Sequence, residues 1–219
     1  MKKHIVAIGG GGFGRKNSPT MIENYILNLS QSDCPKVCFL PTASGDDDSY
    51  IVRFYNVFNR LKCSPSHIEF FKRTINLSKH IANQDVIFVG GGNTKSMLSV
   101  WKEWDMKNIL FEAYSNGVVM SGVSAGAICW FTSGITDSWD NELKILSCLD
   151  FVKGTCCPHY DEEPSRIPYV KRIIQEQIIS NCLSIEGGAA MHYINEKPFK
   201  SLSFDKDKNS YNVYFDNNK

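Results

Sequence analysis

The sequence of residues 117–131 is GVVMSGVSAGAICWF. The apolar run at its start predicts a strand, the apolar run at its end predicts a helix, and Ser124 lies at the turn between them. A tight strand-to-helix turn forces its central residue into a strained conformation, and Gly122 and Gly126 leave room for the backbones to approach. The stretch therefore predicts a nucleophile elbow, in which the first helix amides can stabilise an oxyanion. The alternative is a structural Gly-Ser-Gly turn in an ordinary sheet.

The chain has 219 residues, of which 42% are hydrophobic and 21% are charged, and its formal net charge is +1. This composition is typical of a globular protein, and we expect a single catalytic domain spanning residues 1–219. The near-zero charge argues against a nucleic-acid partner, so a small molecule or a short peptide is the expected ligand. The N-terminus lacks a signal-peptide core and no stretch is long enough to span a bilayer. We expect a cytoplasmic protein with no membrane partner.

Eight cysteines are dispersed mostly through apolar segments, without the paired CxxC spacing of zinc sites. Most are expected to be small core residues in a reducing compartment. Cys156 and Cys157 lie close to His159, but adjacent residues of a strand point to opposite faces. We therefore expect no metal and no other cofactor.

Predicted strands and helices alternate along the chain. Because parallel strands need crossover connections, this order predicts an α/β fold with a mainly parallel sheet and helices on both faces. The expected strands are 5–8, 37–40, 67–71, 85–89, 117–120, 183–185, 190–193 and 201–204, and the expected helices are 20–29, 49–61, 94–104, 106–116, 127–131 and 164–180.

A serine nucleophile needs a base, and imidazole is the usual one near neutral pH. Among the five histidines, His159 is favoured because it follows Cys-Cys-Pro at the expected end of a strand, with His192 as the spare candidate. Glu186, which ends another apolar run, is the expected acid that aligns the base. Asp137 is its main rival. Asp161 and Glu162 are expected to lie too close to His159 in sequence to orient it.

Two glycine-rich loops follow predicted strands. Gly90-Gly91-Gly92-Asn93-Thr94 either completes an oxyanion hole with its backbone amides or is a simple turn with Asn93 or Thr94 as the helix cap. The loop Gly9–Gly14 raises the alternative of dinucleotide binding. However, its spacing is not a clean GxGxxG followed directly by a helix, and the next strand ends without a ribose-binding acid.

Five motifs together resemble the peptidase E family. They are Ile8-Gly9-Gly10-Gly11, Phe39-Leu40-Pro41-Thr42-Ala43-Ser44, Val89-Gly90-Gly91-Gly92-Asn93-Thr94, Gly122-Val123-Ser124-Ala125-Gly126-Ala127 and Pro158-His159. That family includes aspartyl dipeptidases and related aminopeptidases, with cyanophycinases as relatives. The resemblance implies a fold similar to class I glutamine amidotransferase domains.

The resemblance also implies a catalytic triad of Ser124, His159 and Glu186. The order serine, histidine, acid differs from the serine, acid, histidine order of α/β-hydrolases. The family further suggests that the Gly91-Gly92 turn and the Ala125 amide bind the oxyanion, while Asn93 shapes that turn.

Arg166 lies where an aspartate-selective member of the family places an arginine that recognises a carboxylate. The loop before it is shorter here, and Asp161, Glu162 or Glu163 could pair with it. A broader aminopeptidase specificity therefore stays open.

The function expected from these features is that of a serine exopeptidase acting on dipeptides or short peptides. The alternatives are an esterase with the same elbow and a non-catalytic nucleotide- or metabolite-binding protein. A homodimer is conceivable, in which case Trp101, Trp104 and Trp139 either form the interface or pack in the core.

Overall fold

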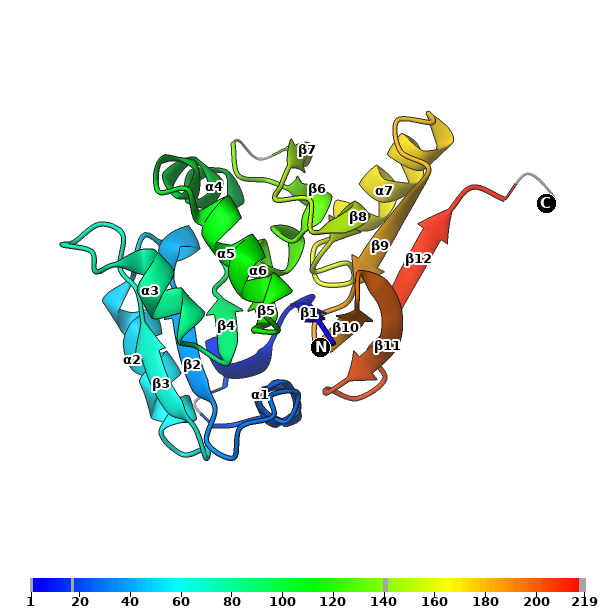
Figure 1. Cartoon of the computed structure of the whole chain (residues 1–219). Coiled ribbons are helices and arrows are strands. Elements are labelled where there is room, and N and C mark those ends of the chain that lie inside the picture. The colour runs from blue at the N-terminus through cyan, green and yellow to red at the C-terminus, as the bar shows by residue number, and fades with distance from the viewer. Residues whose placement is uncertain (1, 17, 140–141, 217–219) are drawn as a thin grey trace.

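The structure is a computed structural model that describes residues 2–16, 18–139 and 142–216. In this part of the chain the strands form two mixed sheets, and the helices lie on their faces (Figure 1). The strand order of the first sheet is β11 (Lys197–Ser203), β10 (Ala189–Ile194), β1 (His4–Ile8), β5 (Val119–Val123), β4 (Val86–Val89), β2 (Lys36–Leu40) and β3 (Ser64–His67). The strand order of the second sheet is β12 (Ser210–Tyr214), β9 (Asn181–Ile185), β8 (Val152–Cys157), β6 (Phe131–Thr136) and β7 (Lys144–Ser147).

The strands are mainly parallel. In the first sheet β1, β5, β4, β2 and β3 run parallel to one another, and β10 and β11 are antiparallel additions beyond β1. In the second sheet β8 is parallel to both β6 and β9, while β7 and β12 are antiparallel edge strands. The α/β fold predicted from the alternating sequence pattern is confirmed.

Helices cover both faces of the first sheet because the buried side chains of its strands alternate. Val6 and Ile8 of β1 pack with α1 (Met21–Leu27) and α2 (Asp48–Phe58) on one face. Ile5 and Ala7 belong to the core on the other face, with α3 (Leu77–Ala82), α4 (Thr94–Glu103), α5 (Met106–Ser115) and the short α6 (Ala125–Ile128). On the second sheet, α7 (Arg166–Gln175) packs against residues of β8 and β9.

Several predicted elements differ from the structure. The helix expected at 127–131 is wrong, since α6 ends at Ile128 and the buried Phe131 already begins β6. An apolar run of this length does not distinguish a helix from a buried strand. The strand expected at 67–71 lies at β3 instead, and neither α3 nor β12 was predicted, because both segments are rich in polar residues.

Of the three tryptophans considered for an interface, Trp101 is a core residue, 1% exposed, and its indole Nε1 donates to Thr42 Oγ1 at 3.1 Å. Trp104 and Trp139 are about two-fifths exposed. Within the described residues no helix is both long and apolar enough to cross a membrane.

A buried polar chain joins α1, β10 and β1. His192 is 1% exposed, and its Nδ1 lies 2.8 Å from Tyr25 Oη while its Nε2 lies 2.9 Å from His4 Nδ1. Burial, with smaller contributions from the charges of His4 and Lys200, lowers the pKa of His192 to about 4. The folded state therefore holds this imidazole neutral where an unfolded chain, with a pKa of about 6.5, would protonate it.

We predict that the stability of the fold decreases as the pH falls from about 6.5 towards 4. The pKa of His192 is lower in the folded state, so the unfolded state binds more protons across this window. At pH 5 the loss attributable to His192 is about 2 kcal/mol. Urea unfolding at pH 7.5 and pH 5 measures this loss, and His192→Gln should reduce the difference in unfolding free energy between the two pH values by about this amount.

His67→Gln is the matched control, because His67 Nδ1 also lies within hydrogen-bonding distance, 2.7 Å, of a tyrosine hydroxyl, that of Tyr55. This variant should keep the pH dependence of the unmodified protein. Equal pH dependence in His192→Gln and His67→Gln would contradict the assignment to His192.

Candidate active site

Ser124 lies at the carboxyl end of β5 with φ 58° and ψ −112°, a backbone conformation that costs free energy for any residue except glycine. Its N–H donates to Ile8 O at 3.0 Å, which ties the turn to the end of β1. A Cβ on Gly126 would lie 2.2 Å from Val89 O, and one on Gly122 would lie 2.4 Å from Gly126 O. Both positions therefore require glycine, and the strained turn predicted from the sequence is confirmed.

His159 follows β8 and Pro158, as predicted, and its N–H donates to Gly9 O at 3.1 Å. Ser124 and His159 line the same pocket, whose volume is about 330 Å³. In the described part of the chain no hydrogen bond joins the two side chains. Hydrogen bonds between catalytic groups are often formed only when a substrate is bound. The residues that line the pocket are Gly11, Gly14, Arg15, Asp47, Tyr50, Arg53, Gly91, Val123, Ser124 and His159.

The carboxylate beside His159 is that of Glu162. Its Oε2 lies 2.6 Å from His159 Nδ1. The expectation that Glu162 is too close in sequence to orient the imidazole is wrong, because the chain turns sharply after His159, which has φ 51°. The N–H groups of Glu162 and Glu163 both donate to His159 O, at 3.1 and 3.2 Å. This turn brings the side chain of the third residue back onto the ring.

Arg15 binds the same carboxylate through both of its terminal nitrogens. Its Nη2 donates to Glu162 Oε2 at 2.6 Å and its Nη1 donates to Oε1, which makes a bidentate pair. The hydrogen bond from Arg15, helped by the one from His159, lowers the pKa of Glu162 to about 2. Glu162 is therefore an anion at neutral pH.

The ionised carboxylate sets the tautomer of His159. A carboxylate only accepts hydrogen bonds, so the 2.6 Å contact places a proton on Nδ1 of the ring. Arg15 Nη2 also lies 3.5 Å from Nδ1, but a guanidinium only donates and a protonated Nδ1 cannot accept, so this contact is not a hydrogen bond in that tautomer. With Nδ1 protonated, Nε2 of the neutral ring carries the free lone pair, as a general base requires.

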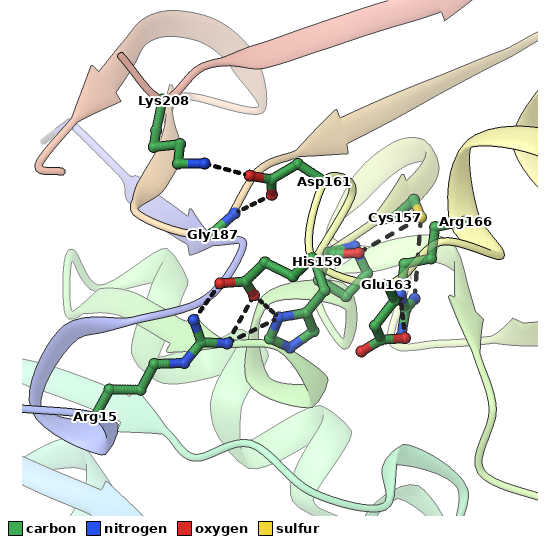
Figure 2. A network of polar contacts seen from close by, with 10 residues as sticks. Arg15, Cys157, His159, Asp161, Glu163, Arg166, Gly187 and Lys208 are labelled. Carbon is green, nitrogen blue, oxygen red and sulfur yellow. Dashed lines mark hydrogen bonds and ion pairs between the residues drawn. The ribbon is translucent and has the colours of Figure 1, made fainter. Parts of the chain in front are cut away.

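Each acid of the segment 161–163 pairs with a different cation, and Figure 2 shows the pairs Asp161–Lys208 and Glu163–Arg166. Asp161 accepts from Lys208 Nζ at 2.5 Å and from Gly187 N at 2.8 Å. Glu163 accepts from Arg166 Nε at 2.7 Å. The three carboxylates thus anchor the turn after His159 to three separate parts of the fold.

The structure does not bring the predicted acid Glu186 to His159. Glu186 Oε2 accepts from Asn209 N at 2.8 Å, and its Oε1 accepts from Tyr211 Oη at 3.4 Å. The cause is the pairing of β12 with β9, which sequence analysis did not predict and which turns Glu186 towards Asn209. The rival Asp137 is exposed just after β6 and is not among the pocket-lining residues.

The loop after β4 fulfils the capping role that the sequence suggested. Asn93 Oδ1 accepts from Ser96 N at 2.8 Å at the start of α4, and Asn93 N donates to Ala43 O at 2.7 Å. Gly92 has φ 137°, and a Cβ there would lie 2.2 Å from the same carbonyl. Gly91 lies beside the nucleophile, because its Cβ would be 3.8 Å from Ser124 Oγ.

Arg166 does not line the pocket, contrary to its expected role as a substrate-binding residue. It is 3% exposed, and its guanidinium donates to Glu163 and, at 3.1 Å, to Ile135 O. In Figure 2 it lies on the opposite side of His159 from Arg15. The side chain is buried because α7 begins at this residue and packs against the second sheet.

No sequence pattern indicated Arg15, Tyr50 or Arg53, and sequence analysis considered Glu162 but set it aside as too close to His159. The spacing of three residues between His159 and Glu162 is a local signal that could have indicated Glu162. Arg15 directly follows the glycine loop, but nothing in the sequence connects it with position 162. Among the described residues no group of three or more histidine, cysteine, aspartate or glutamate side chains could hold a metal ion.

Comparison with known proteins identifies the family of the chain. The sequence pattern of Peptidase family S51 matches residues 5–200. The chain is 45% identical over 212 residues to a protein of Bacillus subtilis (strain 168) named uncharacterized peptidase YgaJ, with 96% of this chain and 92% of that protein covered.

Two solved structures share the fold. A protein from Listeria monocytogenes EGD-e described as a candidate peptidase E superposes with a TM-score of 0.68 at 19% identity, covering 93% of this chain and all of that one. A peptidase from an acI-B1 Actinobacterium also has a TM-score of 0.68, at 14% identity, with 98% of each chain covered. The resemblance to peptidase E is confirmed, and the chain belongs to peptidase family S51, a family of serine-type peptidases.

Proposed function

We propose that the protein is an exopeptidase that removes the N-terminal residue from dipeptides or short peptides through an acyl-enzyme on Ser124. The observation that carries the proposal is a strained serine and a carboxylate-bound histidine lining one small pocket. Its volume of about 330 Å³ is near the lower end of the range of small-molecule sites, about 300–1,000 Å³. Such a pocket suits a short peptide better than a long one.

In the proposed reaction, Ser124 Oγ attacks the scissile carbonyl while His159 Nε2 accepts the hydroxyl proton. The anionic Glu162 stabilises the imidazolium that forms. His159 then donates this proton to the leaving amine, and water hydrolyses the acyl-enzyme with His159 again as the base.

We assign the oxyanion hole to backbone N–H groups on either side of Ser124. Ala125 begins α6, so its N–H has no intrahelical acceptor. Gly91 approaches Ser124 from the loop after β4, and the Gly91-Gly92 turn is held in place by Asn93. Amides of these two segments, with that of Gly91 turning from the Tyr50 hydroxyl to the substrate, would stabilise the negative charge of the tetrahedral intermediate.

We predict that Ser124→Ala lowers peptide hydrolysis at least about a thousandfold, because it removes the attacking oxygen. Wild type and variant are compared on a panel of dipeptides, tripeptides and p-nitrophenyl esters, with the released N-terminal residue identified. Turnover of esters without peptides would instead favour an esterase. Failure to cleave either class, with a metabolite still bound, would favour a non-catalytic binding protein.

We further predict that Glu162→Gln lowers kcat about 10²- to 10⁴-fold, since the amide neither holds the Nδ1–H tautomer nor stabilises the imidazolium. Glu186→Gln and Asp137→Asn are the matched controls, because each also replaces a carboxylate by its amide. They should stay within a few-fold of wild type. If one of these controls loses activity and Glu162→Gln does not, the aligning acid is that residue and not Glu162.

A further inference from the structure

The N-terminal part of α2 presents one face to the active-site pocket. Asp47, Tyr50 and Arg53 all line the pocket, and their spacing of three residues places them on the same side of the helix. The neighbouring Phe54 and Phe58 are buried in the core and fix the orientation of the helix. Nothing in the proposed acyl transfer uses this face.

Arg53 has more N–H donors than its hydrogen bond to Gly14 O uses. Its Nη1 donates to Gly14 O at 2.6 Å, and its guanidinium carbon lies 5.9 Å from the centre of the Tyr50 ring. A guanidinium has five N–H donors. Among the described residues Arg53 forms no ion pair with a carboxylate, so its positive charge is not neutralised by direct contact.

The other charged groups near Ser124 are already engaged. Arg15 is committed to Glu162 through both of its terminal nitrogens. Asp47 caps α2, with Oδ1 accepting from Tyr50 N at 2.8 Å and from Ser49 Oγ at 2.5 Å. These hydrogen bonds, led by that of Ser49, lower the pKa of Asp47, so it stays ionised, and the charge of Arg53 contributes less.

Tyr50 contacts both Arg53 and the loop that borders the nucleophile. Its hydroxyl is 3.5 Å from Gly91 N, and Gly91 in turn lies against Ser124. Burial raises the pKa of Tyr50 to about 12, so the phenol is neutral at neutral pH. Arg53 and Ser124 thus line one pocket of about 330 Å³, and Tyr50 lines it with them.

We propose that Arg53 binds a carboxylate of the peptide substrate inside the active-site pocket. This inference rests on the proposed exopeptidase function and deepens it. The carboxylate that Arg53 binds belongs either to the C-terminus of a dipeptide or to an acidic side chain next to the scissile bond. The planar guanidinium matches a carboxylate in geometry as well as in charge.

Four peptides distinguish the two sources: Ala-Leu, Ala-Leu-amide, Asp-Leu and Asp-Leu-amide. Arg53→Gln is the test variant, since its amide keeps polar N–H donors but carries no charge. It should lower kcat/KM about 10- to 100-fold, mainly through KM, for peptides with the recognised carboxylate, and leave the others within about twofold. Loss confined to the two free acids indicates the C-terminus, and loss confined to the two aspartyl peptides indicates the side chain.

Two further variants separate charge recognition from structural damage. Arg53→Lys keeps the charge and should retain part of the preference for the carboxylate. Arg73→Gln removes the same charge from an exposed position outside the pocket and should behave as wild type. Equal loss on all four peptides, or no loss on any, would overturn the role of Arg53.

A binding measurement keeps this inference separate from the proposed function. Calorimetry on Ser124→Ala and on Ser124→Ala/Arg53→Gln uses the same four peptides. Tighter binding of the carboxylate-bearing peptides that disappears with Arg53→Gln supports Arg53 whether or not the wild type cleaves them. If acids and amides bind Ser124→Ala alike, the inference fails even where peptide cleavage stands.

Discussion

Two consecutive carbonyl groups at the end of β1 hold the nucleophile and the base in place. Ile8 O accepts from Ser124 N at 3.0 Å, and Gly9 O accepts from His159 N at 3.1 Å. Ser124 follows β5 of the first sheet and His159 follows β8 of the second, so one short segment joins the two sheets at the site. Because these are backbone hydrogen bonds, the relative position of the two residues depends on the chain path and not on side-chain packing.

Segments of the chain approach one another this closely only because several positions are glycine and carry no side chain. A Cβ on Gly9 would lie 2.3 Å from Glu186 O, and one on Gly10 would lie 2.8 Å from His159 Nδ1. A Cβ on Gly187 would overlap the carboxylate of Glu162. The glycine loop that raised the possibility of dinucleotide binding is thus required by packing around His159. The loop also leads into the short helix η1 (Gly12–Gly14), and α1 begins only at Met21.

The charged groups of the site hold the His159 ring in the tautomer that carries its proton on Nδ1. Arg15 and His159 share the carboxylate of Glu162, which is partly shielded from water and keeps its charge because both partners donate to it. Arg166, by contrast, is buried and is held by Glu163 and Ile135. Arg15 therefore helps to orient His159 through Glu162, and Arg166 holds the start of α7. Arg53 lines the pocket.

The sequence by itself determined the parts that depend on local pattern. The elbow at Ser124 follows from glycines at fixed spacing, most strands and helices follow from hydrophobic periodicity, and His159 follows from its place after a strand and a proline. The partner of His159 could not be found in this way. Glu162 and Glu186 both follow the ends of strands in the same sheet, and a carboxylate near a histidine in sequence is common. Only the tertiary structure decided between them, because the turn after His159 and the pairing of β12 with β9 determine where each carboxylate points. The same holds for Arg166 and Arg53, since burial or exposure of an arginine depends on contacts between segments far apart in the chain.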